Sequence, residues 1–160
     1  MGMDNPHLFK GTGRMFYGTN WAYLAVDNDI LHYYQWLLKR RFHGRLLLHF
    51  PKAGAHISVV RGAEIDPITP EYRESAWGRH HDEELEFWYD PTVIGFNKEF
   101  FWINTICHPL SGIRTELGLN PRPRYDYHLT IGKIYPEERE NFATYRAAEG
   151  LFRIDSNSEE

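Results

Sequence analysis

The sequence predicts one α+β domain in which short strands alternate with a few helices. The 160 residues, of which 42% are hydrophobic and 25% charged, suit a single globular domain with a sizeable core. Short apolar runs recur along the chain and are separated by turn residues, which favours strands over long helices. The first half follows the order β-α-β and the second half β-β-α-β, so both halves end on a strand.

In the first half, residues 21–26 form a β-like run, and a helix is expected from about Asp29 to Phe42. Asp27-Asn28-Asp29 supplies N-cap candidates, and apolar residues recur at spacings of three and four, which is typical of one helical face. These apolar positions are Ile30, Tyr33, Tyr34, Leu37 and Leu38. A short strand at Leu46–Leu48 and a turn at 51–54 lead to a strand at His56–Arg61.

In the second half, Pro70 marks a helix start, because proline is favoured at the first helical position. Strands at Leu85–Tyr89 and Phe100–Ile106 are expected to form an antiparallel hairpin joined by a loop from Pro91 to Lys98. A helix is expected at Pro109–Leu117, with Gly118 as its C-cap. The proline-rich stretch 120–124 enters the last core strand, Tyr127–Ile134. Residues 136–148 suggest a short tail helix, and residues 1–14 and 155–160 are expected to be flexible.

Two tripeptides of the form His-apolar-hydroxyl carry most of the functional information. They are His56-Ile57-Ser58 and His128-Leu129-Thr130, and each lies in a predicted strand. Alternate side chains of a strand point to the same face, so each histidine projects together with its hydroxyl. If the two strands lie side by side, two imidazoles and two hydroxyls converge. Such a set can bind a phosphate and move protons on both sides of it.

The paired motifs resemble the 2H phosphoesterases, a superfamily named for two His-x-Ser/Thr motifs, and the resemblance spans roughly residues 20–135. The superfamily includes RNA 2′,5′-ligase-like proteins, cyclic phosphodiesterases and phage enzymes that destroy cyclic oligonucleotide signals. It implies two pseudo-symmetric lobes of mixed or antiparallel sheet, with helices outside and a cleft between the lobes. It also implies a phosphodiesterase that needs no metal or other cofactor.

Phosphodiester cleavage needs a base that takes the proton of the nucleophile and an acid that protonates the leaving oxygen. Free imidazole titrates near pH ~6.5, so His56 and His128 can fill both roles at neutral pH. Ser58 and Thr130 would donate hydrogen bonds to the non-bridging phosphate oxygens. The sequence leaves open which histidine is the base, and a structural histidine in each strand is the competing interpretation.

Three further residues are substrate-binding candidates. Tyr23 lies on the first predicted strand, in a stretch similar to the first strand of the phage signal-destroying enzymes, where an aromatic ring stacks on a base. Core packing explains a tyrosine there equally well. Arg122 and Arg124 lie on the loop that enters the second motif strand and could reach a phosphate, although solvated loop charge is the simpler interpretation.

Other patterns are weaker. The run His80-His81-Asp82-Glu83-Glu84 does not predict a metal site, because adjacent histidines diverge and no spaced ligands complete a tetrahedral set. Gly11-Thr12-Gly13 lacks the Lys-Ser/Thr of a phosphate-binding loop. Cys107 and His108 are sequence neighbours, which is poor geometry for a thiol–imidazole dyad.

Composition narrows the class of partner. A net charge of −4 argues against a general nucleic-acid coat protein and against double-stranded DNA, whereas a small nucleotide or a short RNA end needs only a local site. One cysteine and no long apolar run predict a cytoplasmic protein without a membrane span. The oligomeric state stays open. The alternatives to an enzyme are a module that binds a nucleotide or RNA end in the same cleft, and a structural domain.

Overall fold

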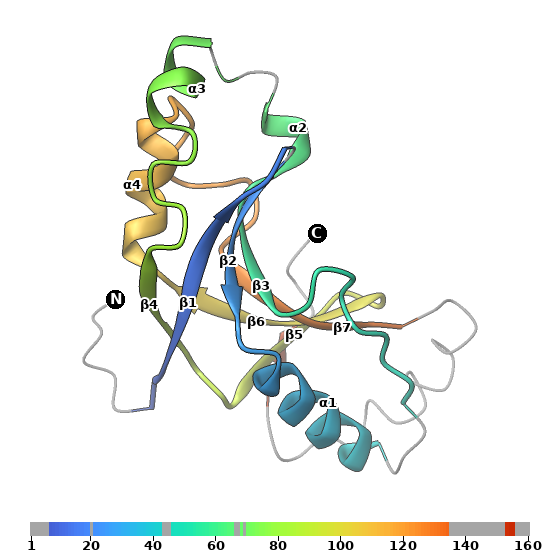
Figure 1. Ribbon diagram of the computed structural model, residues 1–160. Coiled ribbons are helices and arrows are strands. Elements are labelled where there is room, and N and C mark those ends of the chain that lie inside the picture. Colours follow the sequence, from blue (N-terminus) through green and yellow to red (C-terminus); the bar gives the residue numbers. More distant parts are fainter. Residues whose placement is uncertain are drawn as a thin grey trace.

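An antiparallel sheet curls into a six-stranded barrel in the computed structural model of the protein (Figure 1), which describes residues 7–19, 21–42, 46–65, 68, 70–134 and 153–155. The ring runs β4-β1-β2-β3-β7-β6 and closes where β4 pairs with β6. Strands β5 and β8 extend the sheet beyond β6, and β8 runs parallel to β5. The strands are β1 (Phe9–Tyr17), β2 (Ala22–Val26), β3 (His56–Val60), β4 (Glu84–Tyr89), β5 (Val93–Phe96), β6 (Phe100–Ile106), β7 (His128–Lys133) and β8 (Arg153–Asp155).

The helices of the described residues flank this sheet, namely α1 (Asp29–Arg41), α2 (Gly62–Ile65), α3 (Pro70–Ala76) and α4 (His108–Glu116). Figure 1 places α3 and α4 at one end of the molecule and α1 at the other. The predicted α+β class and antiparallel pairing are therefore confirmed. The division into two pseudo-symmetric lobes with a cleft stays a prediction.

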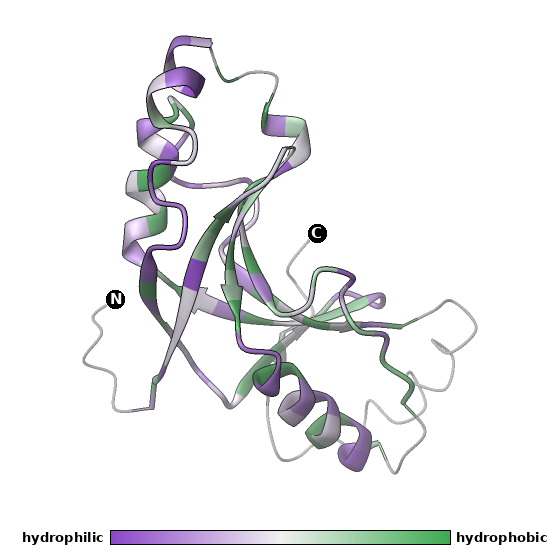
Figure 2. Ribbon diagram, in the orientation of Figure 1, coloured by the Kyte–Doolittle hydropathy of each residue, from purple (hydrophilic) through white to green (hydrophobic). Residues whose placement is uncertain are grey.

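Two separate apolar cores lie against the inner faces of the strands. The first joins β1, β2, β3 and β4 to α4, through residues such as Met15, Leu24, Ile57, Phe87 and Leu110. The second packs α1 against β5, β6 and β7, through residues such as Tyr34, Leu38, Phe96, Phe101 and Ile131. Figure 2 shows hydrophobic and hydrophilic stretches alternating along α1 and α4, as expected of helices with one buried face. No helix in the described part of the chain is long and apolar enough to cross a membrane.

Most predicted elements occur within two residues of their expected bounds, including β3, β6, β7 and both longer helices. Helix α4 ends as predicted: Gly118 has a φ of 74°, and the N–H groups of Gly118 and Leu119 bond back to the carbonyls of Thr115 and Arg114. The predicted antiparallel pairing of β4 with β6 is also confirmed, with Trp88 opposite Ile106, but the two strands are not a simple hairpin because β5 lies between them in the chain and pairs with β6.

Three predictions of local structure are wrong. Residues 9–14 are not loosely held but belong to β1, which pairs with both β2 and β4. The glycines there serve close packing, since a Cβ on Gly11 would lie 2.5 Å from the Phe87 ring. The loop predicted at Pro91–Lys98 contains β5. Leu46–Leu48 forms no strand, because Leu46 and Leu48 fill the second core and only His49 makes a single bridge, to Lys133.

The expected tail helix at 136–148 lies outside the described residues. So do residues 1–6 and 156–160 of the two predicted flexible ends, whereas Asp155 ends β8.

Candidate functional site

The two motif strands are neighbours in the barrel. β3 and β7 pair antiparallel, with Ile57 opposite Leu129. This register sets His56 opposite Thr130 and Ser58 opposite His128. Ile57 and Leu129 are buried in the first core, so the four polar side chains lie together on the other face of the two strands. The structure therefore brings together all four predicted catalytic residues, related by an approximate twofold axis through the Ile57–Leu129 pair.

The two imidazoles are oriented in the same way. Nδ1 of His56 lies 2.8 Å from the carbonyl oxygen of Gly54, and Nδ1 of His128 lies 2.8 Å from that of Asp126. A carbonyl oxygen only accepts, so each Nδ1 carries the proton and donates it. Nε2 is then the ring atom that accepts a proton in the neutral form and donates one in the charged form. Each histidine is thus held in the tautomer that general acid–base chemistry at Nε2 requires.

Partial burial affects the protonation of His56. Burial lowers the pKa of His56 below its usual value; the bond to Gly54 opposes this shift, and the nearby charges of His128 and Arg61 add to it. His56 is therefore largely neutral at pH 7 and can accept a proton. The same sign implies that low pH, which forces a charge onto this buried ring, reduces stability.

A row of aromatic rings leads from His56 across β2 to β1. Tyr23 lies opposite Ser58, and its ring centroid is 5.5 Å from that of His56. Trp21 lies 4.3 Å from Tyr23 and 5.2 Å from His56. Phe16 continues the row at 5.1 Å from Tyr23, and 40% of Phe16 is exposed. The predicted substrate-binding candidate Tyr23 therefore adjoins the site, together with two rings that the sequence analysis did not single out.

The His128 side of the site has a different character. Trp102 of β6 lies opposite Thr130, and its ring is 6.3 Å from His128. Trp102 is fully buried and packs closely over Gly95 of β5, so it forms a fixed neighbour of the site. Asn104, opposite His128 on β6, is exposed. Neither residue was predicted, because the register between β6 and β7 is not readable from the sequence.

The two predicted arginines lie on the loop that leads into β7. The Arg124 guanidinium lies 5.3 Å from the Tyr125 ring, and Arg61, just after β3, lies 5.2 Å from the same ring. Arg122 instead points to Asp126, with 3.8 Å between Nε and Oδ1, and its side chain is largely exposed. The structure thus places Arg124 beside the ends of both motif strands and gives Arg122 a partner within its own loop.

A buried arginine anchors the first motif strand. Arg114 of α4 is 2% exposed and donates to the carbonyl of Val59 in β3 and to that of Asn120, both at 2.7 Å. It also makes a two-pronged pair with Glu64 of α2, at 2.7 and 3.1 Å. Burial alone would raise the pKa of Glu64, but the hydrogen bonds from Arg114 and from the Arg61 N–H lower it overall. This cluster fixes β3 against α2 and α4.

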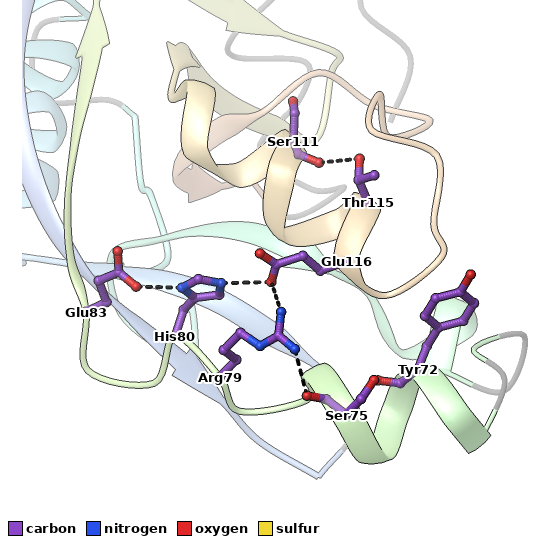
Figure 3. Close-up of polar contacts among 8 residues, drawn as sticks. All are labelled: Tyr72, Ser75, Arg79, His80, Glu83, Ser111, Thr115 and Glu116. Atoms are coloured by element: carbon purple, nitrogen blue, oxygen red, sulfur yellow. Dashed lines mark hydrogen bonds and ion pairs between the residues drawn. The ribbon is translucent and has the colours of Figure 1, made fainter.

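Within the run His80–Glu84, His80 is clamped between two carboxylates (Figure 3). His80 Nδ1 lies 2.6 Å from a Glu83 oxygen, and Nε2 lies 2.8 Å from an oxygen of Glu116 on α4. Carboxylates accept at both ring nitrogens, so the clamp suits the doubly protonated imidazolium. Arg79 reaches the same Glu116 oxygen at 3.6 Å. In the described part of the chain, no group of three or more His, Cys, Asp or Glu side chains could hold a metal ion.

Replacing His80 by glutamine is expected to destabilise the protein more at acidic than at alkaline pH. Burial lowers the pKa of His80, but Glu83 and Glu116 outweigh it and raise the pKa overall. A raised folded-state pKa stabilises the fold fully below about pH 6.5, and this contribution is lost as pH rises through the raised value. The measurement is the free energy of unfolding of both proteins by urea at several pH values.

Glu83→Gln serves as a second variant, since it removes one of the two acceptors and should shrink the same pH-dependent difference. A difference between wild type and His80→Gln that stays constant with pH would show that His80 is not charged in the fold.

The chain matches no known family model, no curated protein and no solved structure. Evidence for a function therefore comes from the geometry of the site itself.

Proposed function

We propose that the protein is a metal-independent phosphodiesterase of the 2H type that acts on a small nucleotide. The observation that carries the proposal is the matched pair of imidazoles on adjacent strands, in each of which Nδ1 bonds to the carbonyl two residues earlier, so that Nε2 is the atom that would exchange a proton. A single histidine whose ring makes one hydrogen bond is explained by a structural role. Two histidines that share one tautomer and each face a hydroxyl favour a reaction with two proton transfers.

His56 is the proposed base and His128 the proposed acid. Burial keeps the pKa of His56 low, so its Nε2 can take the proton of water or of a neighbouring hydroxyl as that oxygen bonds to phosphorus. Nε2–H of His128 protonates the leaving oxygen as the second phosphorus–oxygen bond breaks. Diagonal side chains across an antiparallel pair are roughly 7–8 Å apart, which leaves room for a phosphate between the two rings.

Ser58 and Thr130 lie directly opposite the two histidines, so their hydroxyls flank the same space. Their proposed role is to donate hydrogen bonds to the non-bridging oxygens, where negative charge grows in the transition state. The row Trp21, Tyr23 and Phe16 offers ring faces next to His56, which suits a nucleobase attached to the reacting phosphate. Arg124 would meet phosphate charge at the opposite rim.

We favour a small cyclic nucleotide as the substrate. The candidates are 2′,3′-cyclic phosphates, 2′,5′ linkages and cyclic oligonucleotides. The net charge of −4 and the aromatic neighbours of His56 fit a short substrate better than a long polyanion. A phage enzyme that degrades cyclic oligonucleotide immune signals is the specific form that the family resemblance suggests. The two-lobed 2H fold, with the motif face lining its cleft, belongs to the same proposal.

A product screen tests this function. The protein is incubated with cyclic di- and trinucleotides and with 2′,3′-cyclic mononucleotides in the presence of EDTA, and products are separated by chromatography. We expect at least one substrate to be hydrolysed at a rate that EDTA does not change, because the proposed chemistry uses only imidazoles and hydroxyls. Turnover that stops with EDTA and returns with a divalent ion would contradict the metal-free mechanism. Binding without turnover would identify a nucleotide-binding module instead.

A further inference from the structure

A concave site separate from the motif residues lies at the end of the barrel away from α3 and α4. A cavity of about 610 Å³ opens between the start of β1, the β2–α1 junction and the turn from β4 to β5. None of its lining residues belongs to β3, β6 or β7. The lining residues are Phe9, Gly11, Thr12, Val26, Asp27, Ile30, Tyr33, Tyr34, Phe87, Tyr89, Pro91 and Thr92.

Aromatic rings make up much of the lining of this cavity, and three pairs of them are set at steep angles. Tyr89 is the central ring, with Phe9 at 6.0 Å and 67° and Tyr34 at 6.5 Å and 74°. Phe87 lies 5.9 Å from Tyr89, and Tyr33 lies 5.1 Å from Tyr34 at 83°. Rings arranged in this way can present several faces to one enclosed group. The face of an aromatic ring carries negative potential, which attracts cations.

The charge at the cavity has one sign. Among the described lining residues, Asp27 is the only one with a side chain that is charged at neutral pH, and none is Lys or Arg. A helix N-terminus normally attracts anions, but here the Asp27 carboxylate already accepts from the Asp29 N–H at 2.9 Å, and the Asp27 carbonyl from the Ile30 N–H at 3.4 Å. A second acid, Asp90, follows β4 at the turn and is held by Thr92. The carboxylates of Asp27 and Asp90 therefore disfavour a bound anion and favour a bound cation.

We propose that this cavity binds an organic cation with an alkylated ammonium group, such as a trimethylammonium. The ring faces of Phe9, Tyr33 and Tyr89 would contact its methyl groups, and Asp27 would balance its charge from the rim. A metal ion or a primary ammonium is strongly hydrated. One carboxylate and a few ring faces would not compensate for the hydration that it loses on binding. A neutral apolar ligand would gain no electrostatic attraction from the Asp27 carboxylate. The proposal is independent of the phosphodiesterase activity, since the two sites share no residue.

Nuclear magnetic resonance titration of the full isotope-labelled chain can test this proposal. The probes are choline and its neutral carbon isostere, dimethylbutanol, compared at constant ionic strength. We expect choline to bind with a millimolar Kd, at least about fivefold more tightly than the isostere, which is the size of a partly exposed cation–π contribution. The shifted signals should include the methyl groups of Val26 and Ile30, which line the cavity.

Matched variants separate charge from shape. Asp27→Asn keeps an oxygen that can accept from the Asp29 N–H and is expected to weaken choline about fivefold while leaving the isostere unchanged. Asp29→Asn removes a neighbouring acid that does not line the cavity and should leave both affinities unchanged. Phe9→Leu replaces a ring that is 56% exposed, so the fold should survive while choline binds more weakly. Equal affinity for choline and the isostere, or shifts confined to residues outside the cavity, would overturn the proposal.

Discussion

Replacing either motif histidine by alanine is expected to lower kcat/KM by ~10²–10⁴, the usual contribution of a general acid or base. His56→Ala removes the group that accepts a proton, and His128→Ala removes the group that protonates the leaving oxygen. The His56→Ala/His128→Ala double variant should be scarcely worse than either single one, because the two rings act as a unit in one transition state. Steady-state kinetics on the substrate identified by the product screen provides the measurement.

The control for this series is His32→Ala, which removes an exposed histidine on α1 whose ring lies 4.9 Å from that of Phe50. It should retain wild-type kinetics. Melting curves must show that the motif variants are folded, since His56 is partly buried. Near-normal activity in a folded His56→Ala or His128→Ala protein would remove that residue from the mechanism.

Arg114→Met is expected to destabilise the fold by about 3–5 kcal/mol, which is typical when one partner of a buried ion pair is removed. The substitution leaves Glu64 without its charged partner and removes the donors to the carbonyls of Val59 and Asn120. Because Val59 belongs to β3, the His56 motif strand should also lose part of its anchoring. The free energy of unfolding, obtained from urea titration, measures the effect.

Lys10→Met is the matched control, since it breaks an exposed ion pair, Lys10–Glu86, and should cost less than about 1 kcal/mol. Combining Arg114→Met with Glu64→Leu should recover part of the loss, because no unpaired carboxylate then remains. The cost of Arg114→Met should also shrink as pH falls through the lowered pKa of Glu64, where that group becomes protonated. A cost as small as that of Lys10→Met would show that the cluster does not hold the fold together.

Elements with strong local signals were predictable from the sequence. Helix α1 followed from an apolar stripe after an acidic turn, and the end of α4 followed from Gly118. Alternation within β3 and β7 also predicted that each histidine shares a face with its hydroxyl. Strand β1 was not predicted, because its glycines and polar residues have low strand propensity and its stability comes from pairing on both edges.

The missing parts of the candidate site are those that depend on distant contacts. Phe16 and Trp21 join Tyr23 and His56 only through the pairing of β1, β2 and β3. Arg114 has the pattern of an ordinary charged helix residue, and its partner Glu64 lies 50 positions earlier in the chain. The sequence predicts a four-residue site only if the two motif strands are neighbours. The pairing of Ile57 with Leu129 shows that they are.

The pH dependence of kcat/KM in the presence of EDTA tests the two-histidine mechanism most directly. We expect a bell-shaped profile, whose two apparent pKa values belong to the coupled pair. The acidic limb should lie below about pH 6.5, because burial lowers the pKa of His56, and this base is protonated and inactive beyond that limb. The alkaline limb should report loss of the proton that the general acid of the pair donates. A profile that rises once and then stays flat through alkaline pH would show that no protonated histidine takes part, and would contradict the mechanism.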